Sequence, residues 1–70
     1  MDVRLNIKAI IEDRASSRSE IARRAKMRQQ TFSSVLLCKR GLSAEELIRI
    51  CKALNMTVEE VTNYTSNATN

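Results

Sequence analysis

Residues 17–37 read SRSEIARRAKMRQQTFSSVLL and contain two short sets of apolar positions separated by a polar break. The first set is Ile21, Ala22 and Ala25, and the second is built around Phe32 and Val35. Both sets have the spacing of one helix face. Because the break is only a few residues long, two helices joined by it must cross steeply. This stretch therefore predicts two short helices packed at a large angle through a tight turn.

Three capping patterns predict further helix starts. A Ser or Thr followed three residues later by Glu can satisfy two unpaired amides at the start of a helix. The three pairs are Ser17 with Glu20, Ser43 with Glu46 and Thr57 with Glu60. Each pair precedes an apolar run and so predicts one helix start. The apolar residues at positions 3, 7, 10 and 11 predict a first helix over Val3 to Arg14, and the second apolar set predicts a helix over Arg28 to Leu37.

The composition favours an all-helical fold. The 70 residues include no Pro and a single Gly, Gly41. A sheet with many hairpins needs these turn-forming residues, whereas helices joined by short polar turns do not. The length is that of one small domain. We predict an all-α fold, a compact bundle of about five short helices over residues 1–64, followed by a flexible polar tail over residues 65–70.

Residue types that most reactions and metal sites need are absent or scarce. The chain has no His, the usual general base near neutral pH and the commonest nitrogen ligand of zinc. Cys38 and Cys51 are too few for a tetrahedral metal site and too far apart for a C-x-x-C pair. We find no nucleophile paired with a base at a meaningful spacing. We therefore expect no enzyme, no catalytic residues, no metal and no cofactor.

The same composition bears on location. The apolar and charged fractions, 43% and 29%, are those of a soluble domain rather than of a membrane span. No apolar leader opens the chain. We expect a cytoplasmic protein that does not contact a membrane.

Positive charge is concentrated in the first part of the chain. Residues 1–40 carry ten Lys and Arg against four acids, whereas residues 41–70 carry two against four. The densest stretch, residues 14–28, has six cations opposed only by Glu20. Such a field attracts a polyanion and makes binding salt-dependent, because each neutralised phosphate releases condensed counterions. Nucleic acid is the favoured partner, and a solvated helix surface is the alternative.

The second helix of the opening pair has a polar outward side. On a helical wheel, Gln30, Ser33 and Ser34 point away from the apolar side, with Gln29 on the flank and Arg28 at the start. These side chains supply the donors and acceptors that base edges in the DNA major groove require. The arrangement favours a helix-turn-helix unit that binds double-stranded DNA.

Three motifs are similar to those of a known family. They are S-E-I-A at residues 19–22, Q-Q-T-F at residues 29–32 and L-x-x-I-C-K-A-L-N-M at residues 47–56. From Ile7 to about Tyr64 the sequence resembles the Cro/repressor-type helix-turn-helix family, also called the lambda-repressor-like or XRE family. The resemblance implies a bundle of about five helices whose third helix enters the major groove, usually as a homodimer on a palindromic operator. It also suggests a temperate-phage regulator acting in a bacterial cell.

The resemblance assigns roles to individual positions. The predicted base-reading residues are Arg28, Gln29, Gln30, Ser33 and Ser34. The predicted phosphate-binding residues are Ser17, Arg18, Lys39 and Arg40. The first group would distinguish base pairs, and the second would fix the register without reading sequence. For Arg23 and Arg24 an exposed helix flank and a DNA contact both remain open.

Several positions depart from the family pattern. Lys26 stands where Gly is common, so a left-handed backbone there costs about 1 kcal/mol. Arg28 stands where Ser or Thr is the usual cap, which predicts a poorly capped reading helix. Ser16 replaces a commonly buried Leu. Ile11 and Leu36 replace an Arg and a Glu that often form an ion pair, and an apolar contact can replace that pair with little loss of stability.

Apolar residues suggest a second function, that of an interaction module. The candidate interface residues are Leu36, Leu37, Leu42, Val58, Val61 and Tyr64. The three leucines suggest an antirepressor that keeps the fold but forms a heteromeric complex with a phage repressor, and the last three residues suggest a self-association contact. In the alternative, Leu36 joins the core, Leu37 is covered by the following loop, and the last three residues close the core.

Overall fold

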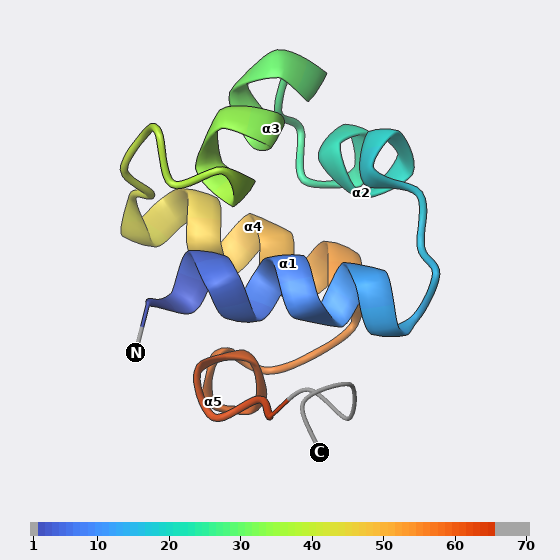
Figure 1. The fold of residues 1–70 in the computed structure, drawn as a ribbon, viewed down its shortest axis with the longest axis vertical. Helices are drawn as coiled ribbons and strands as arrows, with labels where there is room; N and C mark the ends of the chain where they lie inside the picture. The colour runs from blue at the N-terminus through green and yellow to red at the C-terminus, as the bar shows by residue number, and fades with distance from the viewer. Residues whose placement is uncertain (1, 66–70) are drawn as a thin grey trace.

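The computed structural model describes residues 2–65, which form five α-helices (Figure 1). The helices are α1 (Val3–Asp13), α2 (Arg18–Arg24), α3 (Gln29–Leu36), α4 (Ala44–Leu54) and α5 (Val58–Thr62). No strand occurs in this part of the chain. The predicted all-α fold is confirmed, and each predicted helix is present. The two helices predicted with both ends, Val3 to Arg14 and Arg28 to Leu37, differ from α1 and α3 by at most one residue at an end. Residues 66–70 of the predicted tail lie outside the described part.

Side-chain caps define most of the helix starts. Asp2 caps α1 through its carboxylate. At α4 and α5 the predicted capping boxes are complete: Ser43 and Thr57 each accept a bond from the amide three residues on. In return, the carboxylates of Glu46 and Glu60 accept from the cap amides at 3.0 and 2.8 Å. Local sequence therefore determines where these two helices begin.

The first four helices are each followed by a residue with left-handed backbone. Ala15, Lys26, Cys38 and Asn55 have φ values of 52°, 58°, 58° and 58°. In each case the next amide donates back to a carbonyl in the last turn of the helix, at 2.9 to 3.0 Å. This arrangement satisfies carbonyls that would otherwise lack a partner. Lys26 thus adopts the left-handed conformation whose cost relative to Gly is about 1 kcal/mol.

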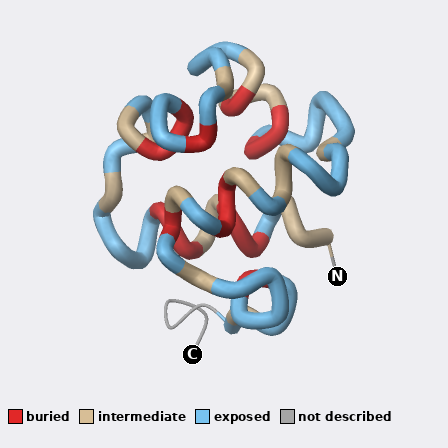
Figure 2. Tube along the Cα trace, turned by 180° about the vertical axis from the view of Figure 1, so that it is seen from behind, coloured by how far each residue is buried: buried red, intermediate tan, exposed pale blue. Residues whose placement is uncertain are grey.

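The helices enclose one apolar core. α2 packs on α3 and α4, α3 also packs on α1, and α5 packs on α1 and α4. The α2–α3 pair lies at one end of the molecule and α5 at the other (Figure 1), and buried residues turn inward between them (Figure 2). The buried apolar residues are Ile7, Ile10, Ile11, Ile21, Ala22, Ala25, Phe32, Val35, Leu36, Ile50, Cys51, Leu54 and Val61. This packing holds α2 and α3 at the surface by their inner faces.

Two family-specific departures have a simple outcome in the core. Ile11 and Leu36 are 2% and 1% exposed and belong to the same buried cluster, where α1 packs on α3. Apolar packing thus replaces the ion pair often found at these positions, and no charge has to be desolvated. Ser16, which replaces a commonly buried Leu, is half-buried.

Three polar side chains fasten helix ends to neighbouring helices. Asn6, only 5% exposed, donates from Nδ2 to the last two carbonyls of α5, each at 3.0 Å. Arg14 Nη1 donates to the last carbonyl of α4 at 2.7 Å, and Arg49 Nε donates to the C-cap carbonyl of α2 at 2.9 Å. Helix C-termini carry partial negative charge, so the two guanidiniums are also favoured electrostatically.

Candidate nucleic-acid interface

α3 presents an uncharged polar side at the molecular surface. Gln29 and Gln30 are exposed, and Ser33 and Ser34 are half-buried. The opposite side of the helix is fixed in the core by residues that include the fully buried Phe32. The structure therefore brings together the predicted neutral base-reading residues on one short helix, with the glutamines more accessible than the serines.

Arg28 is the N-cap residue of α3, but its side chain does not cap the helix. Its backbone is extended, with φ −66° and ψ 143°, and its side chain makes no cap hydrogen bond. The predicted poor cap is confirmed, because a guanidinium has no acceptor to offer the first amides of a helix. The side chain is exposed, and residues 2–65 provide no hydrogen-bond or ion-pair partner for it.

The loop between α3 and α4 is tied to the bundle at two points. Arg4 Nη1 donates to the Arg40 carbonyl at 2.8 Å, and the Arg40 guanidinium pairs with Glu46 at 3.1 Å. The Ser43 amide bond, followed by the Arg40 contact, lowers the pKa of Glu46. Lys39 is exposed, with no partner in the described part of the chain. Of the two predicted phosphate-binding residues in this loop, only Lys39 has a charge that no carboxylate balances.

Asp2 orients Arg4 at the start of α1. The Arg4 guanidinium donates three bonds of 2.5 to 3.1 Å to the Asp2 carboxylate. Chiefly because of these bonds, the pKa of Asp2 falls from 3.8 to about 2. The thiol of Cys38 also lies 3.8 Å from the same carboxylate, as a hydrogen-bond donor. The first residues of α1 and the loop after α3 therefore form one connected unit.

Ser17 is the N-cap of α2, and Arg18 is the first residue of this helix. Ser17 Oγ accepts from the Glu20 amide at 3.3 Å and shares a 3.0 Å hydrogen bond with Ser19 Oγ. Arg18 is half-buried, and its guanidinium lies 3.7 Å from the Glu12 carboxylate. At this distance the ion pair is loose, so the guanidinium can exchange one anionic partner for another.

Glu20 does not complete the predicted capping box. Its Oε2 accepts from Arg23 Nη2 at 2.6 Å and from Arg24 Nε at 2.8 Å, and these bonds lower the pKa of Glu20. The prediction of a reciprocal box at α2 was wrong because cations three and four residues further along the helix compete for the same carboxylate. Arg23 and Arg24 are exposed, as the helix-flank alternative states, and each is paired.

Unpartnered cations gather at the two ends of α3. Within residues 2–65, the Lys and Arg side chains without a hydrogen-bond or ion-pair partner are Lys8, Lys26, Arg28, Lys39 and Lys52. Lys26 and Arg28 precede α3, and Lys39 follows it. Sequence reasoning treated residues 14–28 as one positive field and gave Lys26 no role. The spacing of Glu20 from Arg23 and Arg24 was the signal for the pairing on α2.

Comparison with protein families agrees with this geometry. The family described as Cro/C1-type HTH DNA-binding domain matches residues 6–67, a range that includes α2 to α5 entirely. The chain belongs to this family. The match confirms the resemblance drawn from the sequence motifs and establishes a DNA-binding domain. Neither a curated protein nor a solved structure matched the chain.

Four of the predicted interface residues of this Cro/C1-type domain are not freely exposed. Leu36 and Val61 are 1% and 0% exposed, so the prediction that they lie at an interface was wrong. They are buried because α3 and α5 need apolar anchors in the core. Leu42 and Tyr64 are half-buried and pack against the core, and the Tyr64 hydroxyl donates to Asp13 at 2.6 Å.

Other apolar side chains of the domain do reach solvent. Leu37 is 52% exposed, so the loop does not cover it, and Val58 is 39% exposed. Leu5 and Ile48, which the sequence analysis did not select, are 51% and 47% exposed. Leu37 lies at the end of α3 and Val58 at the start of α5, and these two helices lie on opposite sides of α1 and α4 in the Cro/C1-type bundle (Figure 1).

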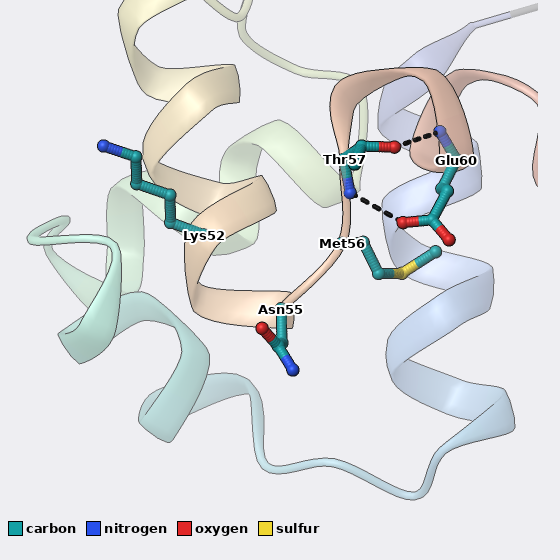
Figure 3. A pocket seen from close by; sticks show the side chains of 5 residues that line it. All are labelled: Lys52, Asn55, Met56, Thr57 and Glu60. Atoms are coloured by element: carbon teal, nitrogen blue, oxygen red, sulfur yellow. Dashed lines mark hydrogen bonds between the residues drawn. The ribbon is translucent and has the colours of Figure 1, made fainter.

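A cavity of about 320 Å³ lies at the turn between α4 and α5 (Figure 3), lined by Lys52, Asn55, Met56, Thr57 and Glu60. Thr57 and Glu60 satisfy each other through both capping bonds, at 2.8 and 3.0 Å, and Lys52 points away from the other lining residues.

Across residues 2–65 there is no group of three His, Cys, Asp or Glu side chains that could hold a metal ion. In the same range, no helix has the length and apolar character needed to cross a membrane.

Proposed function

We propose that this protein is a sequence-specific transcriptional regulator that places α3 in the major groove of an operator. The observation that carries the proposal is the exposed, uncharged polar side of α3 between the unpartnered cations Arg28 and Lys39. A helix in the major groove needs donors and acceptors for base edges, which Arg28 and the glutamines offer, and positive charge near the phosphates, which Lys39 offers. Occupying a promoter in this way requires no chemical step.

Readout of sequence falls to the start of α3. The amides of Gln29 and Gln30 match the N6 and N7 groups of adenine, and the Arg28 guanidinium matches O6 and N7 of guanine. Ser33 and Ser34 lie about one turn further along the helix and can donate to or accept from base edges. The side chains of Arg28, Gln29 and Gln30 are all exposed, which supports this assignment.

Phosphate contacts fix the register of the complex. Ser17 and Arg18 lie at the start of α2, and Lys39 and Arg40 lie in the loop after α3, so the proposed phosphate contacts come from before and after the reading helix in the sequence. Arg18 and Arg40 have carboxylate partners in the isolated domain, with which a phosphate must compete. Lys39 has no such competitor among the described residues and contributes most.

Selection of an operator from a random duplex library tests the proposal. Gln29→Ala or Gln30→Ala should lower discrimination between the selected site and single base changes by about 1 to 3 kcal/mol. Asn63→Ala removes another exposed amide, at the end of α5, and should leave discrimination unchanged. A selection that returns no preferred sequence, or glutamine variants with wild-type preference, would refute sequence reading by α3.

A homodimer on a two-fold symmetric operator is part of this proposal. Val58 is 39% exposed at the start of α5, and α5 lies at the end of the bundle away from α3 (Figure 1). Two copies joined there keep both reading helices accessible. Light scattering across a concentration series should show a wild-type dimer and a Val58→Glu monomer. A wild-type protein that remains monomeric on palindromic DNA would contradict this assembly.

Leu37 favours a second candidate function, that of an antirepressor. This side chain is 52% exposed at the end of α3, where a partner protein would cover both the leucine and the reading helix. Under this proposal the chain co-purifies with a phage repressor encoded nearby and binds DNA weakly alone. A complex that survives Leu37→Glu unchanged would exclude this surface.

A further inference from the structure

The positive stretch over residues 14–28 does not act as one uniform charge. Its four arginines on or beside α1 and α2 all have partners: Arg14 with a carbonyl of α4, Arg18 with Glu12, and both Arg23 and Arg24 with Glu20. The two remaining cations of the stretch are Lys26 and Arg28, for which the described residues provide no partner. Within the described helix-turn-helix unit, the cations without any partner are therefore Lys26 in the turn and Arg28 at the N-cap of α3.

The backbone at this turn does not by itself explain why a lysine is present. Lys26 has φ 58°, and its amide donates to the Arg23 carbonyl at 3.1 Å, so a Gly would fit this position with less strain. Ala15 holds the equivalent position after α1 with φ 52° and carries no charge. Only the side chain distinguishes the two positions, and that of Lys26 is exposed.

We propose that Lys26 binds a phosphate of the DNA backbone beside the reading helix. The inference rests on the DNA-binding role proposed above and adds a residue to it. Lys26 precedes the N-cap of α3 by two residues, so its charge lies next to the position where Arg28 and Gln29 meet DNA. A flexible four-carbon stem ending in a compact ammonium suits a phosphate, whose position varies little with sequence, better than a base edge.

A duplex of arbitrary sequence is a sufficient probe, because a phosphate contact acts on every sequence. Lys26→Gly keeps the backbone conformation and removes the charge. This variant should unfold at a temperature about 4 °C higher than the wild type, since Gly relieves the left-handed strain. It should nevertheless bind the duplex about five- to tenfold more weakly at 0.1 M salt, with a salt slope reduced by about 0.9.

Ala15→Gly is the matched control. It relieves the same backbone strain at the end of α1 and should give a similar rise in unfolding temperature without changing DNA affinity or salt slope. If the wild type binds the duplex and Lys26→Gly binds equally well with the same slope, the assignment of Lys26 is overturned while the DNA-binding role stands. If the folded wild type binds no duplex at low salt, the proposed function fails together with the role of Lys26.

Discussion

Arg4 Nη1 donates a hydrogen bond of 2.8 Å to the backbone carbonyl of Arg40, 36 positions later in the chain. The same guanidinium is held by the Asp2 carboxylate, so its direction is fixed from both sides. The first turn of α1 thereby positions the loop that carries Lys39. A residue with no expected DNA contact thus determines where Lys39, the proposed phosphate-binding residue, lies relative to α3.

Arg4→Met should loosen this loop. Without the guanidinium the Arg40 carbonyl loses its partner, so amide hydrogen exchange over residues 38–42 should accelerate, as measured by NMR. Binding to all duplexes should weaken, with sequence preference unchanged, because the role proposed for the loop is to bind phosphates rather than bases. Lys8→Met removes a cation without a partner from the same helix and serves as the control. Equal exchange rates in the two variants would rule out positioning by Arg4.

The carboxyl group of Asp2 should make the fold sensitive to acid. Its pKa falls from 3.8 to about 2, mainly because of the Arg4 hydrogen bonds. Since the folded pKa is the lower one, ionised Asp2 stabilises the fold above about pH 4, and this contribution is lost as the pH falls towards 2. An NMR titration of the carboxyl carbon should give a midpoint near 2 in the wild type and a higher midpoint in Arg4→Met, which keeps only the bond from the backbone amide of residue 4. A wild-type midpoint near 3.8 would be inconsistent with the observed contacts.

Glu46→Gln should strengthen DNA binding. The glutamine oxygen can still accept from the Ser43 amide, but the Arg40 guanidinium loses its carboxylate partner and becomes available to phosphate. Affinity for a duplex of arbitrary sequence should rise about threefold to tenfold, with a steeper salt slope. Glu45→Gln changes the net charge equally but releases Arg49, which lies on α4. The same gain in both variants would show a general charge effect and not the release of Arg40.

Sequence patterns located the helices well because their signals are local. The caps Ser43 and Thr57 each act within three residues, and the apolar spacing around Phe32 identified the buried side of α3 and thus its exposed glutamines. At α2 the capping pattern predicted the helix start but not the partner of Glu20, because the Glu20 carboxylate pairs with Arg23 and Arg24 within one helical turn.

Features that depend on tertiary packing could not be predicted in this way. Asn6 binds a carbonyl of α5, and Arg40 pairs with Glu46. These residues come into contact only when the chain folds. The same limit applies to the reading surface, because which cations keep an unbalanced charge depends on the positions of all acids and carbonyls around them. For this reason Lys26 gained a binding role only in the structure.

Restoring the ion pair often found in this family at positions 11 and 36 should show coupling. Leu36→Glu alone places an unpaired charge in the core and should cost more than about 3 kcal/mol of unfolding free energy. The double variant Ile11→Arg with Leu36→Glu should recover part of that loss. Urea denaturation of both single variants and the double variant measures the coupling. Strictly additive losses would mean that the two positions do not face each other.

Asn6 should determine how firmly α5 is attached. Asn6→Ala leaves two carbonyls at the end of α5 without their donor, which should cost about 1 to 3 kcal/mol and speed amide exchange in α5. Asn6→Asp should be worse near neutral pH, because a carboxylate would then face those carbonyls. Thermal unfolding at pH 7 compares the three proteins. If Asn6→Asp matched the wild type, the observed amide orientation would be incorrect.

Pairing of Arg23 and Arg24 with Glu20 has a kinetic consequence on a chromosome. Fewer counterions are displaced when the domain touches a random site, so each unproductive stop is brief and the molecule moves on quickly by sliding or hopping. A DNA-binding domain of this kind should bind random sites with lower affinity and should therefore search the chromosome faster.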